Sequence, residues 1–328
     1  MRVGLKRGNI SYAFFGATNF SRELLLFLIK NNFIPKAIFS IPEEFTITYN
    51  KKRVKVKNVN YANLKEVAEE YGVPHYEVDS GMEGKKLKNY EDIIKNLNLD
   101  LILVLGWYYM VPKSIRNLAR YGAWGIHASL LPKYAGGAPL VWAIINGEKE
   151  TGVTLFRLDD GIDDGDIIAQ KSFSIDDEDT IKEVYAKATE ASKQILAEVL
   201  DDIENVRFTP QDKSKIEVYP QRTPEDGLIN WNQEAKKIYD FIRAQTLPYP
   251  CAFTIINGKK IKVISSKIVD MVNYDYLPGE IVCINNKILV AAKDKFLELG
   301  IIDDGSKITQ FKDYVMEMNL SGKIFNEI

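Results

Sequence analysis

The stretch from Trp124 to Asp166 constrains the fold more than any other part of this 328-residue chain. Gly122 to Ser129 has the pattern of a short buried strand, and Thr151 to Leu158 predicts a second strand that leads into the acid-rich loop Asp159–Asp166. His127, one of only two histidines, stands near the end of the first strand. Open α/β sheets place their chemistry at strand ends, so we expect the imidazole and the carboxylates to meet at one sheet edge.

A core histidine beside a solvated acidic loop is the plainer alternative, but the surrounding residues favour the functional interpretation. They are His127, Ser129–Tyr134, Gly136–Pro139, Gly147, Thr151–Thr154, Gly161, Asp163 and Gly165. In this order they closely resemble the signature of the folate-dependent N-formyltransferases over about forty positions. That family includes methionyl-tRNA formyltransferase, glycinamide ribonucleotide formyltransferase and the sugar-nucleotide N-formyltransferases.

The resemblance implies two catalytic residues and reveals one departure. His127 matches the family's histidine and would donate a hydrogen bond to the developing oxyanion. Asp163 matches the family's aspartate and would orient the imidazole and relay protons. Gly125 occupies the position of the family's asparagine, which would be a second donor. A water, a backbone amide or a neighbouring residue replaces that donor, or the enzyme is slow, or the chain is a degenerate protein that only binds the family's ligands.

The resemblance also implies N10-formyltetrahydrofolate as the formyl donor, with no metal in the transfer. Leu99–Leu105 is a continuous apolar run typical of a central parallel strand, and the aromatic segment Gly106–Pro112 follows it. This segment is either aromatic core or a wall for a flat heterocycle. The family favours the second interpretation, which predicts a donor pocket formed by Tyr108, Tyr109, Met110 and Val111 together with Asp159, Gly161 and Ile162.

The predicted acceptor is the amino group of a nucleotide-linked sugar, because Arg222–Asp226 is closer to the sugar-modifying relatives. The predicted acceptor-binding residues are Ser129, Lys133, Tyr134, Tyr219 and Arg222. Methionyl-tRNA formylation is the alternative, and a net charge of -2 disfavours a nucleic-acid partner. The basic run Lys51–Lys57 does not resemble the family's tRNA-binding insertion and fits a solvated hairpin and a phosphate-binding surface about equally well.

Two domains are expected from the order of the predicted elements. Strands alternate with helices as far as the long predicted helix Thr180–Ile203, which indicates a Rossmann-like catalytic domain with a mostly parallel sheet over residues 1–208. Short strands and the turn Asn257-Gly258 then predict a small antiparallel, OB-like β-barrel over residues 209–328. The segment GATNF at residues 16–20 lacks the spacing G-x-G-x-x-G, which disfavours a nicotinamide oxidoreductase.

Composition bears on compartment and assembly. The two cysteines, Cys251 and Cys283, have no histidine nearby in the sequence, which argues against a zinc site and for a reducing compartment. No apolar run reaches about 18 residues, so we expect a cytoplasmic protein with no membrane partner. His75 follows a proline at a strand start and is predicted to be structural. Among closed assemblies, a homodimer is the default expectation.

Overall fold

A computed structural model describes residues 10–49, 52–58, 60–78 and 87–326. The chain packs into two compact units, and each unit draws on separate segments of the sequence. The first unit contains the chain up to Ala135 with residues 152–173 and 187–218, and the second contains residues 136–151, 174–186 and 219–328. The linear division at residues 208 and 209 stays a prediction.

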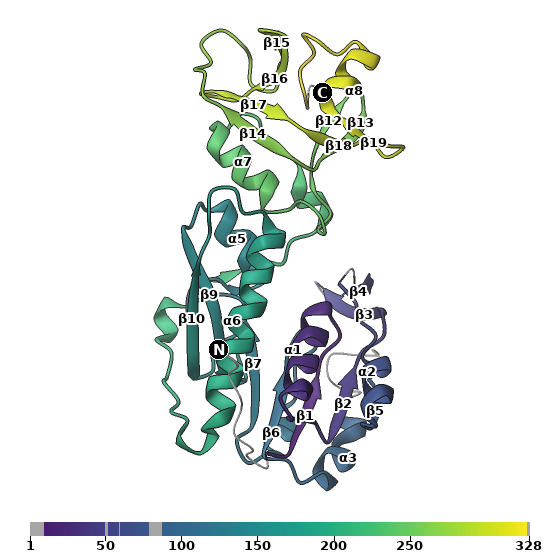
Figure 1. Ribbon diagram of the computed structural model, residues 1–328, viewed down its shortest axis with the longest axis vertical. Coiled ribbons are helices and arrows are strands. Elements are labelled where there is room, and N and C mark those ends of the chain that lie inside the picture. The colour runs from purple at the N-terminus through teal and green to yellow at the C-terminus, as the bar shows by residue number, and fades with distance from the viewer. Residues whose placement is uncertain (1–9, 50–51, 59, 79–86, 327–328) are drawn as a thin grey trace. The chain divides into compact units, whose positions relative to one another are not determined.

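The first unit is built on a seven-stranded sheet in the order β10-β9-β7-β6-β1-β2-β5 (Figure 1). Its strands β5, β2, β1, β6 and β7 run parallel, and β9 is antiparallel to β7. Every residue of β1, β2 and β6 is buried, as expected for parallel strands covered on both faces. The predicted mostly parallel α/β fold is therefore confirmed. The strands are β1 Tyr12–Phe15, β2 Ala37–Ser40, β5 His75–Glu77, β6 Leu101–Val104, β7 Ala123–His127, β9 Glu150–Arg157 and β10 Ile167–Ser174.

Helices connect most of these strands, and nearby side chains cap the first turns of α1 and α2. Thr18 and Ser21 form a capping box at the start of α1. One half of the predicted capping box of α6 is present, since the Thr180 backbone N–H donates to Glu183 Oε2 at 3.0 Å, while the Thr180 hydroxyl accepts from the Lys182 backbone N–H at 3.2 Å. No helix in the described part of the chain is long and apolar enough to cross a bilayer. The helices are α1 Asn19–Lys30, α2 Leu64–Tyr71, α3 Glu91–Asn96, α4 Lys113–Arg116 and α6 Ile181–Asp201, with 3₁₀ turns at Leu87–Tyr90, Ile203–Asn205 and Lys213–Lys215.

The basic run of the sequence lies on a separate hairpin. Strands β3, Glu44–Tyr49, and β4, Lys52–Lys57, pair antiparallel over their whole length. Lys51 falls outside the described residues. A further short pair consists of β8, Ala135–Gly136, and β11, Val218–Tyr219.

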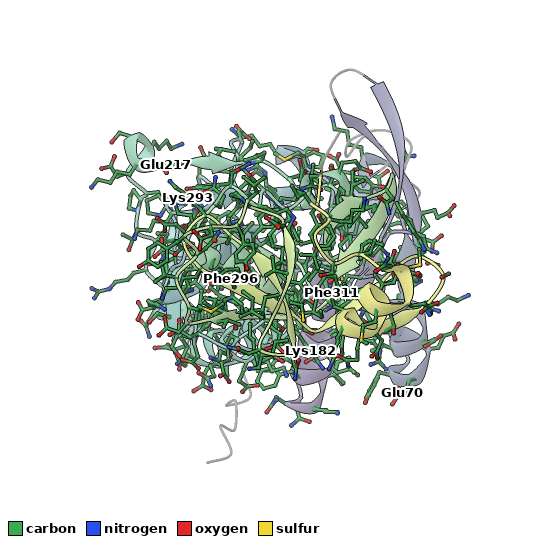
Figure 2. The ribbon with its side chains drawn as sticks, turned by 90° about the horizontal axis from the view of Figure 1, so that it is seen from above. Glu70, Lys182, Glu217, Lys293, Phe296 and Phe311 are labelled. Carbon is green, nitrogen blue, oxygen red and sulfur yellow. The ribbon has the colours of Figure 1, made fainter. Side chains whose placement is uncertain are left out.

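The second unit is dominated by two four-stranded sheets, in the orders β12-β13-β18-β19 and β14-β17-β16-β15, whose pairings are antiparallel. The predicted C-terminal antiparallel fold is confirmed. Asn257 and Gly258 both have positive φ, 50° and 72°, and form the predicted turn between β12 and β13. Phe296 and Phe311, labelled in Figure 2, are buried in this unit. Its elements are α5 Pro139–Ile145, α7 Ala235–Arg243, α8 Phe311–Met318, the 3₁₀ turn Pro224–Gly227, β12 Ala252–Ile256, β13 Lys259–Val263, β14 Ser266–Val269, β15 Ile281–Ile284, β16 Lys287–Ala291, β17 Phe296–Leu299, β18 Ile301–Asp303 and β19 Ile308–Gln310.

The second histidine and the two cysteines are placed singly. His75 Nε2 lies 2.8 Å from Ser40 Oγ across neighbouring strands. Burial lowers the pKa of His75, and Lys65 lowers it further. Cys251 is buried and Cys283 is exposed. Within the described ranges, no three His, Cys, Asp or Glu side chains are grouped as metal ligands would be.

Candidate active site

His127 ends β7, where two hydrogen-bond acceptors approach its ring. The residue is only 8% exposed. Its Nε2 lies 2.7 Å from the carbonyl oxygen of Tyr134, and its Nδ1 lies 3.4 Å from Asp163 Oδ2. A neutral imidazole carries a single N–H, so it can donate to only one of these acceptors at a time. The structure therefore brings His127 and Asp163 together, one from a strand end and the other from the loop after β9.

Both residues that contact the imidazole have strained backbones. Tyr134 has a φ of 55° and Asp163 has a φ of 49°, in the left-handed region that residues other than glycine seldom adopt. Such conformations cost about 1–3 kcal/mol each and persist where the surrounding structure enforces them, often at functional sites. The strain sets the directions from which the carbonyl and the carboxylate approach His127.

A buried arginine binds the start of the loop that contains Asp163 through a hydrogen bond and ion pairs. Arg116, on α4, is 6% exposed. It donates from one terminal nitrogen to the carbonyl oxygen of Leu158 at 2.9 Å. The guanidinium also pairs with Asp159 at 3.7 Å and forms a close ion pair with Asp160. One side chain thus contacts three consecutive residues at the start of the loop.

Gln211 holds the far end of the same loop. Its side-chain amide donates to the carbonyl oxygens of Asp163 at 2.8 Å and Gly165 at 2.6 Å. Position 165 requires glycine, because a Cβ there would lie 1.7 Å from the carbonyl oxygen of Arg157. Neither Gln211 nor Arg116 was predicted, since a single polar residue outside any motif gives no periodic or spacing signal.

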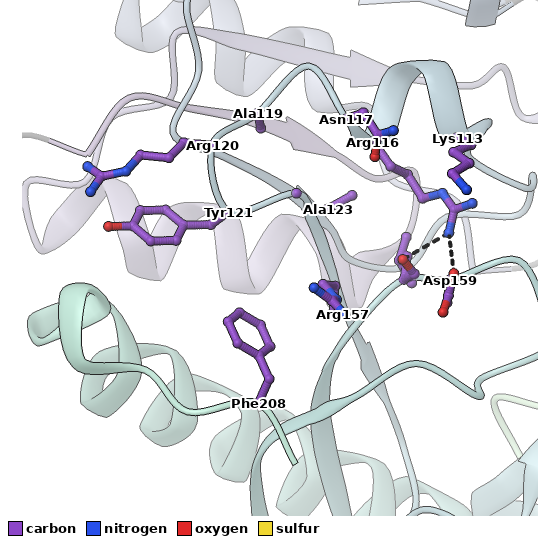
Figure 3. A pocket seen from close by; sticks show the side chains of 12 residues that line it. Lys113, Arg116, Asn117, Ala119, Arg120, Tyr121, Ala123, Arg157, Asp159 and Phe208 are labelled. Atoms are coloured by element: carbon purple, nitrogen blue, oxygen red, sulfur yellow. Dashed lines mark hydrogen bonds and ion pairs between the residues drawn. The ribbon is translucent and has the colours of Figure 1, made fainter. Parts of the chain in front are cut away.

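A cavity of about 410 Å³ lies beside the Arg116 ion pairs (Figure 3). Its lining is rich in cations and aromatic rings. Arg157 is 2.6 Å from Asp166 and lies over the ring of Phe208, 5.1 Å from its centroid. Arg116 is buried, whereas Lys113 and Arg120, which also line the cavity, are exposed. The side chains that dominate the lining are Lys113, Arg116, Arg120, Tyr121, Arg157 and Phe208.

The predicted donor-binding residues occupy two loops of the first unit. Tyr108, Met110 and Ile162 are exposed, whereas Val111 is buried. The Tyr108 hydroxyl donates to Asn58 Oδ1 at 3.0 Å. The helix α4 directly follows the first loop, and Arg116 on that helix contacts the second. Tyr109, Asp159 and Gly161 belong to the same two loops, and the donor-binding role of all seven residues stays a prediction.

Gly125 faces a leucine at the start of the loop after β9. Residues 125 and 127 point to the same face of β7, because side chains alternate along a strand. A Cβ at position 125 would lie 2.9 Å from Leu158 Cδ2 and 3.4 Å from Phe156 Cε1. The end of the Leu158 side chain therefore occupies the space where the family's asparagine would begin.

Three of the predicted acceptor-binding residues lie in the first unit, on the turn after β7. Ser129 is fully buried and its hydroxyl donates to the carbonyl oxygen of Lys133 at 2.6 Å. The Thr154 hydroxyl donates to the Ser129 carbonyl oxygen at 2.7 Å. These bonds shape the turn that presents the Tyr134 carbonyl to His127. The Lys133 side chain is exposed.

The other two predicted acceptor-binding residues belong to the second unit. The Arg222 guanidinium lies over the rings of Trp142 and Phe241, at 4.8 and 5.4 Å from their centroids. It also donates to Gln245 Oε1 at 2.8 Å. The Tyr219 ring is 5.5 Å from that of Trp142. Within their own unit, both side chains take part in an aromatic cluster.

Comparison with known proteins gives two family matches and several relatives. Residues 15–200 match the family model for formyl transferase, and residues 222–319 match that for its C-terminal domain. Methionyl-tRNA formyltransferase of Thermodesulfovibrio yellowstonii is 32% identical over 89% of this chain and 92% of its own length. The methionyl-tRNA formyltransferase of Alkaliphilus oremlandii is 32% identical over 92% of this chain and 95% of its own length. The solved N-formyltransferase of Helicobacter canadensis, in complex with folinic acid and dTDP-3-aminofucose, has a TM-score of 0.63 and 20% identity over 92% of this chain and 99% of that one.

These relatives contradict two predictions. The amino sugar nucleotide acceptor is wrong, because relatives with 29–36% identity are named methionyl-tRNA formyltransferases, whereas the sugar enzyme shares only the fold. The prediction that the net charge disfavours a nucleic-acid partner is wrong for the same reason. A net charge of -2 averages over the whole chain and conceals local basic runs such as that of β4. The likeness of the Arg222 segment to the sugar-modifying relatives is outweighed by these matches over most of the chain.

The predicted family and the predicted class of enzyme, a formyl-transferring one, are confirmed by the matches to both parts of the chain. N10-formyltetrahydrofolate is the formyl donor of that family. His127 and Asp163 lie in the first matched segment, and Arg222 lies in the second, so both parts of the chain match the same family. The chain belongs to the formyltransferase family.

Proposed function

We propose that this protein transfers the formyl group of N10-formyltetrahydrofolate to the amino group of methionyl-tRNA. The observation that carries this proposal is the match to relatives of that name along nearly the whole length of both chains, 92% and 95% for the protein of Alkaliphilus oremlandii. The contact between His127 and Asp163 supports it, because formyl transfer needs both an oxyanion donor and a route for protons.

The chemistry follows from the residues around His127. The neutral amine of the methionyl group attacks the formyl carbon, and the carbonyl oxygen becomes an oxyanion. The protonated imidazole has two N–H donors: Nε2–H donates to this oxyanion in place of the Tyr134 carbonyl, and Nδ1–H donates to Asp163 Oδ2, 3.4 Å away, which fixes the ring's orientation. The bond from the formyl carbon to N10 then breaks, and N10 receives the proton that the amine loses. Asp163 guides that transfer through water.

We assign the donor to the two loops that α4 and its Arg116 connect. Exposed apolar side chains on both loops, those of Tyr108, Met110 and Ile162, support contact with a flat heterocycle. Trp107, in the first loop, has a buried indole N–H with no acceptor among the described residues.

The acceptor's phosphates are assigned to the hairpin β3–β4. Strand β4 reads KRVKVK, with cations at Lys52, Arg53, Lys55 and Lys57. Clustered cations neutralise phosphates and release counterions, so affinity for RNA depends steeply on salt. Between the two interpretations of this run, a solvated hairpin and an anion-binding surface, the relatives' common name favours the second.

The proposed function predicts formylation of methionyl initiator tRNA and salt-sensitive binding. Formylmethionine released from the product by base hydrolysis should appear by mass only when N10-formyltetrahydrofolate is present. Replacing Lys52 and Lys55 with alanine should weaken binding and reduce the slope of log K against log salt by about one for each phosphate that is no longer neutralised. Lys287→Ala, an exposed lysine of the second unit, is the matched control. Wild-type enzyme that leaves methionyl-tRNA unformylated would refute the proposal.

Restoring an amide at position 125 is expected to raise the turnover number. A second oxyanion donor can contribute about 10²- to 10³-fold, and Gly125→Asn supplies one if the loop accommodates it. The obstructing Leu158 methyl is the end of a flexible side chain, so the variant should fold, with a stability loss of about 1–3 kcal/mol from overpacking. Stopped-flow transfer rates and the melting temperature measure the two effects.

Gly125→Ala is the matched control for this substitution, because it adds the same Cβ without a donor. A faster Asn variant beside an unchanged Ala variant would show that the native site has a single side-chain donor. Equal rates for both variants would instead show that a backbone amide or water already fills the second position.

A further inference from the structure

Asn58 is a buried polar residue that joins three segments of the first unit. It is 3% exposed and directly follows β4. Its Nδ2 donates to the carbonyl oxygen of Ala17 at 2.9 Å, and its Oδ1 accepts from the Tyr108 hydroxyl at 3.0 Å and the Asn60 backbone N–H at 3.1 Å. Its own backbone N–H donates to the carbonyl oxygen of Glu43 at 2.8 Å. Asn58 therefore closes the base of the hairpin β3–β4 and extends beyond it.

The segments that Asn58 contacts lie at the active-site edge of the sheet. Ala17 follows β1 and Gly106 follows β6, and the Ala17 backbone N–H donates to the Gly106 carbonyl oxygen at 3.1 Å. Strands β1, β6 and β7 are parallel neighbours, so their carboxyl ends share one edge. His127 is the last residue of β7 at that edge. The hairpin is thus tied by a buried side chain to the edge where transfer takes place.

Tyr108 carries the connection into the predicted donor pocket. It lies in the loop after β6, the first of the two loops assigned to the folate. The residue is 47% exposed, but its hydroxyl is fixed by a side chain that is almost completely buried. The Tyr108 hydroxyl and Asn58 Oδ1 make a direct side-chain bond between the donor loop and the hairpin base. The orientation of the ring therefore depends on the position of Asn58.

We propose that Asn58 and Tyr108 couple the RNA-binding hairpin to the donor pocket, so that RNA on the hairpin strengthens folate binding. This inference rests on the proposed function. A polyanion on β3–β4 would restrict the segment that positions Asn58, and Tyr108 would then lose less conformational freedom when the folate binds. Linkage requires the effect to be reciprocal, so folate also strengthens RNA binding by the same factor.

The coupling predicts that the dissociation constant of the folate differs with and without RNA, and that this ratio depends on the Tyr108 hydroxyl. Isothermal titration calorimetry would measure binding of tetrahydrofolate with and without saturating uncharged initiator tRNA, a pair that cannot react. A single neutral hydrogen bond supports an effect of about fivefold, so we expect RNA to lower the wild-type Kd by about that factor. In Tyr108→Phe, which removes only the hydroxyl, the ratio should fall to about one.

Tyr90→Phe is the matched control, since its hydroxyl also makes one hydrogen bond, to the Glu77 carbonyl oxygen at 2.7 Å. That variant should keep the fivefold ratio. A Tyr108→Phe variant that retains the ratio, or that changes only the melting temperature, would overturn the coupling and leave a structural role. A wild-type ratio of one in an enzyme that formylates methionyl-tRNA would also overturn it. Failure of wild-type enzyme to formylate methionyl-tRNA would instead refute the proposed function and remove the basis for the coupling.

Discussion

Replacing His127 with alanine is expected to lower the turnover number by about 10²- to 10⁴-fold, the range for losing an oxyanion donor or a general acid–base group. The imidazole is held between the Tyr134 carbonyl and Asp163, and alanine leaves no donor at that point of the sheet edge. Single-turnover transfer from N10-formyltetrahydrofolate to methionyl-tRNA, followed by rapid quench, reports the chemical step directly. Donor affinity should change little, because His127 acts on charge that develops in the transition state.

The chain offers a natural control for this experiment in its only other histidine. His75, at the start of β5, contacts Ser40 at the end of β2 and not Asp163. His75→Ala should therefore leave the rate of transfer near the wild-type value. Asp163→Asn is the companion variant, because it keeps the shape of the side chain but removes the charge that orients the ring. If His127→Ala retains more than about a tenth of wild-type turnover, neither oxyanion stabilisation nor proton transfer can depend on this imidazole.

The fold was largely predictable because its central strands are encoded locally. The run Leu99–Leu105 contains β6, and the turn Asn257-Gly258 fixes a hairpin through its own positive φ angles. Strand β14 and helix α8 were not predicted. The segment of α8 has apolar residues at helical spacing, Phe311, Tyr314 and Val315, but it is only eight residues long, and the apolar residues of β14 gain meaning only against the neighbouring sheet.

The residues of the candidate site that belong to a sequence motif could be predicted, whereas those that act through tertiary contacts alone could not. His127 and Asp163 are separated by 36 positions, yet the resemblance paired them and the structure sets them 3.4 Å apart. Gln211 holds the loop of Asp163 through backbone carbonyls, and Arg116 does so through the Leu158 carbonyl and two acids 43 and 44 positions further along the chain, so neither contact leaves a local sequence signal. The acceptor was misjudged because whole-chain charge cannot report on a single hairpin.

Replacing Arg116 with methionine is expected to lower kcat by about 10²-fold, because small misplacements of catalytic groups have effects of that size. Arg116 fixes the start of the loop that delivers Asp163 to His127. We expect the loss of stability to be smaller than is usual for breaking a buried ion pair. Removing one partner of a buried pair typically costs about 3–5 kcal/mol, but the side chains of Asp159 and Asp160 are 51% and 67% exposed and can be solvated. Loss of the charged hydrogen bond to Leu158 then dominates, at about 1.5–3 kcal/mol.

Kinetics and urea unfolding of the same variants separate these two effects. Arg116→Lys keeps the charge but not the planar fork that reaches several acceptors, so its turnover should lie between those of the wild type and Arg116→Met. Arg120→Met removes an exposed arginine from the same cavity and should leave both kcat and stability near wild type. If Arg116→Met lost stability but kept its turnover, Gln211 alone would suffice to position Asp163, and the arginine would serve the fold rather than the reaction.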